Sequence, residues 1–166
     1  MDEEVQKLVE QGFVIKVQRE TVDHGQPEWY MPLQAVFTPE KSTVRLLFDS
    51  SFKGHNGLSL NDHLEKGPNY INSLPNVLTA WRWDEVVFAG DNRKMFNLVL
   101  VHPDDQVPHR ILWRKNQHDP PTVYQWLRLN FGDKPAPDIA SNAINILAKA
   151  SQNEFHEAAK ELQERT

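Results

Sequence analysis

The sequence lacks cysteine altogether, so disulfide bonds and thiolate metal sites are excluded. It also lacks long apolar runs, and a stretch such as residues 86–89 is far too short to span a bilayer. The chain begins Met-Asp-Glu-Glu, which has the wrong charge for a secretory signal. We therefore expect an intracellular protein, in the cytoplasm or the nucleus, that has no membrane partner.

An excess of basic residues is missing as well. The 166 residues include 18 Lys or Arg and 23 Asp or Glu, which gives a formal net charge of −5. The acidic excess lies at the two ends, because residues 1–30 carry a net −4 and residues 136–166 a net −2. This charge balance argues against a large basic surface of the kind that binds nucleic acid strongly. It leaves open a basic groove formed by the middle of the chain, where residues 81–135 carry +1.

The apolar content is sufficient for a folded core. Hydrophobic residues make up 39% and aromatic residues 10% of the chain, which excludes global disorder. Apolar periodicity and turn residues predict a mixture of helices and strands, of class α+β or α/β, and we adopt α+β. The expected helices are residues 2–11, 72–82, 138–149 and 152–164, and the expected strands are 13–17, 33–37, 43–49, 86–90, 97–101, 110–114 and 122–130.

Two of these predictions specify which residues face inward. In the helix over 138–149 we expect Ile139, Ala143, Ile144 and Leu147 to face the core. In the helix over 152–164 we expect an apolar stripe of Phe155, Ala158, Ala159 and Leu162, after a capping box formed by Ser151 and Glu154.

Common catalytic motifs are absent from the sequence. No phosphate-binding loop of the Gly-x-x-x-x-Gly-Lys or Gly-x-Gly-x-x-Gly type occurs, and no serine lies in a Gly-x-Ser-x-Gly elbow. His102, His109 and His118 lie on turn-rich sequence without the spacing of a helical zinc site, so we interpret them as surface or turn residues.

Asp91 is a more specific candidate for a functional residue than these histidines. It follows the apolar run 86–90, and a carboxylate at the exposed end of a buried strand is a natural ligand for Mg²⁺. A turn-forming aspartate after a strand explains the same pattern.

Several stretches, taken in order, resemble one family. Residues 44–49 read VRLLFD, residues 56–62 read NGLSLND and are followed by Gly67-Pro68, and residues 89–96 read AGDNRKMF. Residues 101–105, residues 110–114 and Phe131-Gly132 continue the series. Together they resemble the reverse transcriptases of the Bel/Pao family of LTR retrotransposons, over nearly the whole chain.

The resemblance implies a partial polymerase right hand. Residues 1–166 would form a single reverse-transcriptase-like domain, with 1–82 largely fingers and 83–166 a partial palm. Asp91 would be the first metal-binding carboxylate, and the metal would be Mg²⁺. In the nucleotide site, Arg45 would contact the triphosphate, Asp49 would position Arg45, Phe96 would sense the sugar 2′ position, and Gly132 and Pro137 would lie under the templating pair.

The sequence also departs from the family. No Tyr-x-Asp-Asp occurs, and the chain ends at Thr166, about where that hairpin begins in the family. One carboxylate does not satisfy two Mg²⁺ ions. We therefore expect a retrotransposon-derived domain that is catalytically inactive, holds no cofactor unless polymerase activity keeps Mg²⁺, and acts as a binding or interaction module.

Alternative readings stay open. In the first alternative, the chain is a fragment of an active RNA-directed DNA polymerase whose second catalytic carboxylates lie outside it. In the second, it is a different α+β domain with similar motifs. Loss of the last palm hairpin would uncover a sheet edge. We accordingly expect a protein partner or a homodimer through that edge, and weak binding of RNA or DNA.

Overall fold

The computed structural model describes residues 1–18, 28–38, 43–83, 85–87 and 89–165. The expected loop over 20–32 therefore lies partly outside the described residues. Helices and antiparallel sheets are both present, which confirms the α+β class.

The chain forms two compact units, and each combines segments from both halves of the sequence. The first unit contains Met1–Glu65 and Phe96–Lys134, and the second contains Lys66–Met95 and Pro135–Thr166. The division into a fingers-like part over 1–82 and a palm-like part over 83–166 stays a prediction.

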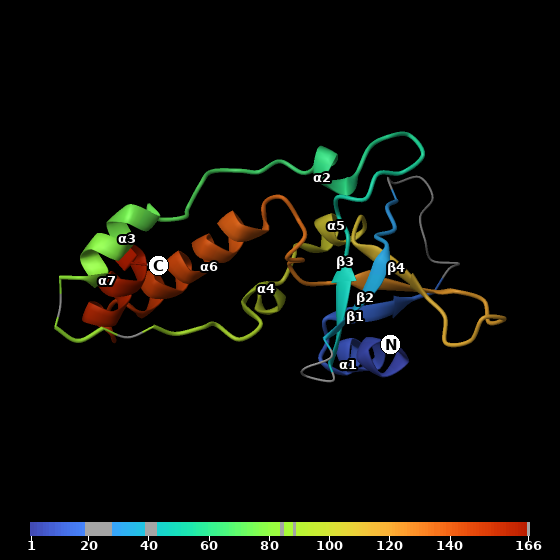
Figure 1. Ribbon diagram of the computed structural model, residues 1–166, viewed down its shortest axis with the longest axis horizontal. Coiled ribbons are helices and arrows are strands. Elements are labelled where there is room, and N and C mark those ends of the chain that lie inside the picture. The colour runs from blue at the N-terminus through green and yellow to red at the C-terminus, as the bar shows by residue number, and fades with distance from the viewer. Residues whose placement is uncertain (19–27, 39–42, 84, 88, 166) are drawn as a thin grey trace. The chain divides into compact units, whose positions relative to one another are not determined.

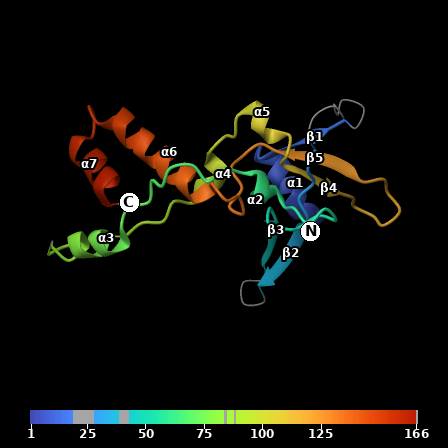
Figure 2. The same ribbon diagram turned by 90° about the horizontal axis from the view of Figure 1, so that it is seen from above.

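The first unit is built on a three-stranded antiparallel sheet and a separate hairpin (Figure 1). In the sheet, β5 lies between β1 and β4, as Figure 2 also shows. The hairpin pairs β2 with β3. The elements are α1 (Asp2–Glu10), β1 (Val14–Val17), β2 (Leu33–Thr38), β3 (Thr43–Phe48), α2 (Leu60–His63), α4 (Met95–Leu98), α5 (Pro103–Gln106), β4 (Arg110–Trp113) and β5 (Thr122–Trp126).

The first helix ends as its sequence predicts. Gly12 has a φ of 66°, a left-handed conformation that costs glycine little. Its amide donates to the Val9 carbonyl and the next amide, of Phe13, donates to the Leu8 carbonyl. This is the Schellman arrangement, and it turns the chain from α1 directly into β1.

One face of the three-stranded sheet carries the core of this unit. Trp126 is 1% exposed, and its ring centroid lies 4.6 Å from that of Phe48 and 6.4 Å from that of Phe13. Val5 of α1 and Ile111 of β4 complete the packing, and both are fully buried. The core thus joins α1, the sheet and the end of the hairpin.

The second unit is helical in its described part. It contains α3 (Leu74–Trp81), α6 (Ala136–Ser151) and α7 (His156–Arg165). α7 packs against α6 and α3. α3 begins after Ser73 with proline in its first turn, as the sequence predicts.

The strand predicted over 86–90 is wrong for its described residues. Val86 is 84% exposed and Val87 41% exposed, and neither belongs to a strand. The run belongs to the second unit, whose described residues form no strand with which it could pair. The run is apolar, but periodicity alone does not supply a pairing edge.

The strand predicted over 97–101 is also wrong. Its start belongs to the short helix α4, and only Leu100 makes an isolated bridge, to Arg128. The residues after this run form the short helix α5, at whose start the His102 ring accepts a hydrogen bond from the Asp104 amide.

The predicted inward faces of the last two helices are confirmed only in part. Ala159 of α7 is buried as expected, and Ala143 and Ile144 of α6 are half-buried. α6 buries the small residues Ala140 and Ala148, while Ile139 and Leu147 are 40% and 61% exposed. α7 begins at His156, after the predicted capping box, and Phe155 is 56% exposed. Alanines let two helices approach closely, and here that packing leaves the larger side chains outside.

Trp126 provides the first test of this fold. We expect Trp126→Ala to lower the free energy of unfolding by about 3–5 kcal/mol, because it empties the centre of the core. Trp126→Phe should cost less, since the buried indole Nε1 has no hydrogen-bond partner to lose. Chemical denaturation measures both. Trp83→Ala is the control, because Trp83 is 85% exposed, and an equal effect of the two alanine variants would contradict the core described here.

Candidate functional site

Three of the segments that carry the family resemblance meet in the first unit. They are the end of β3 with the residues after it (48–51), the start of α2 with its cap (59–62), and the segment after β5 (130–134). Hydrogen bonds join these three segments, and we call this region the junction.

A buried carboxylate holds the junction together. Asp133 Oδ1 accepts a 2.5 Å hydrogen bond from Ser50 Oγ and a 3.2 Å bond from Asn130 Nδ2. Asp133 Oδ2 lies 2.9 Å from His109 Nε2. All four side chains are buried, and Asn130 Nδ2 also donates to Ser50 Oγ at 2.9 Å. We call these four residues the Asp133 cluster.

The partners of His109 define its protonation state. Nε2 faces the Asp133 carboxylate and Nδ1 lies 3.0 Å from the Asp105 carbonyl, and both of these groups are acceptors. Only the imidazolium donates from both nitrogens. Burial disfavours this charged form, but the hydrogen bond and negative charge of Asp133, with the Asp105 contacts, raise the pKa of His109 overall.

The Asp133 cluster contains serine, histidine and aspartate but does not form a nucleophilic triad. In such a triad the histidine receives the serine proton. Here the Ser50 hydroxyl donates to Asp133, and both nitrogens of His109 are engaged elsewhere. Ser50 is also only 1% exposed. The arrangement therefore positions backbone segments and offers no attacking group.

Asn61 ties α2 to the same junction. Its Nδ2 donates to the Gly132 carbonyl and to Ser51 Oγ, each at 2.9 Å, and its Oδ1 accepts from the Lys134 amide at 2.8 Å. The helix start itself is fixed by Asp62, whose carboxylate accepts hydrogen bonds from the Ser59 amide and hydroxyl. These two bonds lower the pKa of Asp62.

Gly132 lies where a side chain does not fit. A Cβ at this position would come within 2.9 Å of the Phe48 carbonyl oxygen and 3.3 Å of Asn130 Nδ2. The close contact brings the segment over 130–134 against the end of β3. Glycine is required here for space.

The structure brings some of the predicted site residues together. Gly132 packs against Phe48, the residue before Asp49, and Asp49 Oδ1 accepts a bond from the Ser51 amide. Arg45 lies on β3, with an exposed side chain. Their predicted contacts with a nucleotide stay predictions.

The remaining predicted residues are not among those that the hydrogen bonds of the junction join. Phe96 is half-buried in α4 of the first unit. Asp91 belongs to the second unit and is exposed, and so is Pro137 in the first turn of α6. Asp91 lacks the buried strand on which its role as a Mg²⁺ ligand was predicted.

Within the described part of the chain, no three or more His, Asp or Glu side chains are grouped so that they could hold a metal ion. A search of the same residues for a helix with the length and apolar character of a membrane span also found none.

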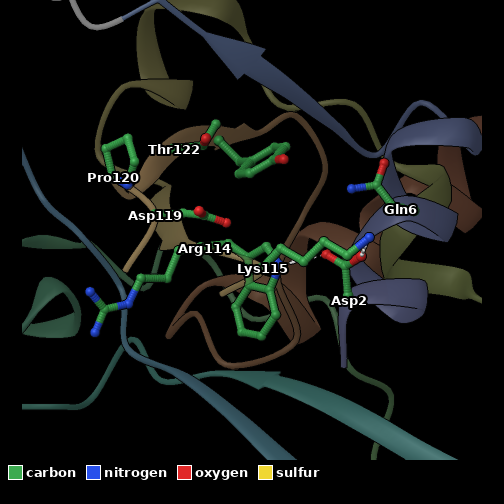
Figure 3. A pocket seen from close by; sticks show the side chains of 9 residues that line it. Asp2, Gln6, Arg114, Lys115, Asp119, Pro120 and Thr122 are labelled. Atoms are coloured by element: carbon green, nitrogen blue, oxygen red, sulfur yellow. Dashed lines mark hydrogen bonds and ion pairs between the residues drawn. The ribbon is translucent and has the colours of Figure 1, made fainter. Parts of the chain in front are cut away.

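A pocket of about 330 Å³ lies elsewhere in the first unit, between α1 and the β4–β5 loop (Figure 3). Asp2 of α1 accepts a hydrogen bond from Trp113 Nε1 at 3.1 Å, and Lys115 Nζ lies 3.8 Å from the same carboxylate. Asp119 on the opposite wall accepts from Asn116. The polar groups of this pocket mainly fasten the loop to the helix, and none of the predicted site residues lines it.

Sequence reasoning missed four residues of the junction: Ser50, His109, Asn130 and Asp133. His109 was interpreted as a surface or turn residue, which is wrong because it is 4% exposed. Ser50 follows Asp49 directly, and Asn130 and Asp133 flank Phe131-Gly132. Their position beside motif residues is the feature of the sequence that could have identified them.

No family model and no curated protein sequence matches this chain.

Gly132→Ala tests the close approach. We expect a loss of about 1–3 kcal/mol in the free energy of unfolding, because the Phe48 carbonyl is backbone and cannot rotate away. Gly90→Ala is the matched control, since a Cβ there meets nothing within 4 Å. Equal unfolding midpoints for the two variants would contradict the geometry of the junction.

The raised pKa of His109 predicts a pH dependence of stability. The folded state holds the His109 proton more tightly than the unfolded state, so its stabilisation is fully present below about pH 6.5, the ordinary pKa of histidine. It is lost as the pH rises through the folded pKa. Denaturation at a series of pH values should show stability falling across this window, and His109→Gln should flatten that part of the profile. An unchanged slope in His109→Gln would assign the titration to another group.

Proposed function

We propose that this chain is a retrotransposon-derived, reverse-transcriptase-like domain that acts as a binding module for nucleic acid. The observation that carries the proposal is the junction, because three segments chosen for their family resemblance are joined there by direct hydrogen bonds. A partial right-hand fold, with fingers and an incomplete palm, is the architecture that this proposal implies.

The surface of the junction has the chemistry for weak nucleic-acid binding. Asn61 bonds to Ser51 and to the Gly132 carbonyl, and the chain neighbours of these two residues are Phe52 and Phe131. These rings are 51% and 45% exposed. Aromatic faces stack with bases at about 1–3 kcal/mol per base.

Cations accompany these rings. Lys53 follows Phe52 and is exposed, and Lys134 is exposed with its Nζ 3.4 Å from the Asn61 carbonyl. Lysines neutralise phosphates, and the number of phosphates contacted sets the salt dependence of binding. Because the whole chain has a net charge of −5, we expect binding to depend on this local group and to be weak.

The proposal treats the domain as a binding module without polymerase activity. Asp91 lies in the second unit, and the described residues offer no carboxylate group that would hold two Mg²⁺ ions with it. Phosphoryl transfer to a primer end needs such a pair of ions. The second candidate function, a fragment of an active RNA-directed DNA polymerase, requires the missing carboxylates to come from outside this chain.

Fluorescence anisotropy with a labelled RNA–DNA primer–template tests the binding. We expect micromolar affinity at low salt, and a log–log salt slope that falls by about 2 in the double variant Lys53→Gln, Lys134→Gln. The control is Lys16→Gln, Lys115→Gln, which removes two exposed lysines outside the junction. No binding at low salt, or equal losses in both double variants, would overturn the proposal.

Primer extension on the same hybrid with Mg²⁺ separates the two candidate functions. The binding module gives no extension. Extension that Asp91→Asn abolishes would establish the polymerase fragment instead.

A further inference from the structure

Helix α6 presents an apolar stripe to solvent. Ile146 is 60% and Leu147 61% exposed, and Ile139 is 40% exposed. Ala150 is also exposed and Ala143 partly so. At 100° per residue these five positions lie within about one third of the helix circumference.

The spacing of the stripe is that of a helix–helix seam. Ile139, Ala143, Ile146 and Ala150 follow one another at intervals of four, three and four residues. This is the a/d spacing of coiled coils, in which the apolar residue at every third or fourth position inserts into a facing helix.

The opposite side of α6 is already occupied. Ala148 is 1% exposed, α6 packs against α7, and Ala159 of α7 is also 1% exposed. The packing of α6 on α7 therefore uses the alanine side and leaves the Ile139–Ala150 seam outside it. An antiparallel helix pair with a second apolar stripe commonly completes its core by pairing with another hairpin.

The charges favour an identical partner. α6 carries only Asp138 and Lys149, so its net charge is zero. The second unit as a whole has seven basic and eight acidic residues, a net charge of −1, so two copies hardly repel each other. Nearly uncharged surfaces associate readily.

We propose that two copies of this chain dimerise through α6, with the two helices antiparallel across a two-fold axis. In this register Ile139 of one copy faces Ala150 of the other, and Ala143 faces Ile146. Each large residue thus meets a small one, and the seam is complementary to itself, as a two-fold interface requires. Leu147 packs at the edge of the same contact.

The size of the seam determines how tightly we expect the two copies to bind. A helix of 16 residues is about 24 Å long, and the contact of two such helices is smaller than the standard interface of about 800 Å² per partner. We therefore expect a dissociation constant in the micromolar range. This surface shares no residue with the junction, so the dimer does not depend on the proposed nucleic-acid binding.

Sedimentation velocity of the full chain from about 1 to 200 μM tests the dimer. The wild type should shift from monomer to dimer over this range, and Ile146→Lys should remain monomeric, because it places a charge in the seam. Gln152→Lys adds the same charge at the exposed C-terminal cap of α6, outside the seam, and should dimerise normally. Nucleic-acid affinity should be the same in all three proteins.

Single cysteines test the register, since the natural chain has none. Under mild oxidation Ile139→Cys alone and Ala150→Cys alone should not cross-link, because identical positions lie far apart in an antiparallel pair. An equal mixture of the two variants should form the mixed disulfide, since positions 139 and 150 face each other.

Each other result overturns the proposal. Cross-linking of the single variants with themselves would show a parallel pair. A wild type that stays monomeric at all concentrations would show that the seam is covered within one chain or by a different protein. Dimerisation that survives Ile146→Lys would place the interface elsewhere.

Discussion

The Asp133 carboxylate is the constraint on which the junction depends. An ionised carboxylate taken out of water loses several kcal/mol of hydration, which only donors at hydrogen-bond distance can offset. Asp133 finds three, on Ser50, Asn130 and His109, and they come from the segment after the hairpin, from its own segment and from the residue before β4. Satisfying one charge therefore fixes three backbone segments. Gly132 can then contact the Phe48 carbonyl, and Asn61 can add α2 to the same assembly.

Short stretches of sequence correctly predicted the elements that are determined by neighbouring residues. The spacing of Val5 and Leu8 before Gly12 specified α1 and its end, and alternating residues around a short turn specified the β2–β3 hairpin. The apolar run over 86–90 shows where such reasoning stops. A strand exists only with a partner, and the second unit, to which this run belongs, has no strand among its described residues.

The candidate site likewise contains residues that the sequence identifies and residues that only the structure reveals. Asp49 and Gly132 were recognisable because they belong to motifs, but the Asp133 cluster joins residues 83 and 24 positions apart, and no spacing rule connects them. His109 illustrates the difficulty best. Its sequence surroundings are those of a surface turn, and only the buried carboxylate of Asp133 gives it an interior role. Polar residues beside motif residues are thus worth examining as supports, even where no chemistry is expected of them.

The two units solve the problem of apolar burial differently. The first places its large side chains, among them Trp126 and Ile111, on one face of a sheet that α1 covers. The second buries alanines between α6 and α7 and leaves isoleucine and leucine outside. A small helical unit of this kind buries too little apolar surface to offset its lost chain entropy easily. Because α6 has only two charged residues, its exposed face lacks the charge of a surface that remains in water. A second helix that packs on this face accounts for its regular seam of alternating large and small residues.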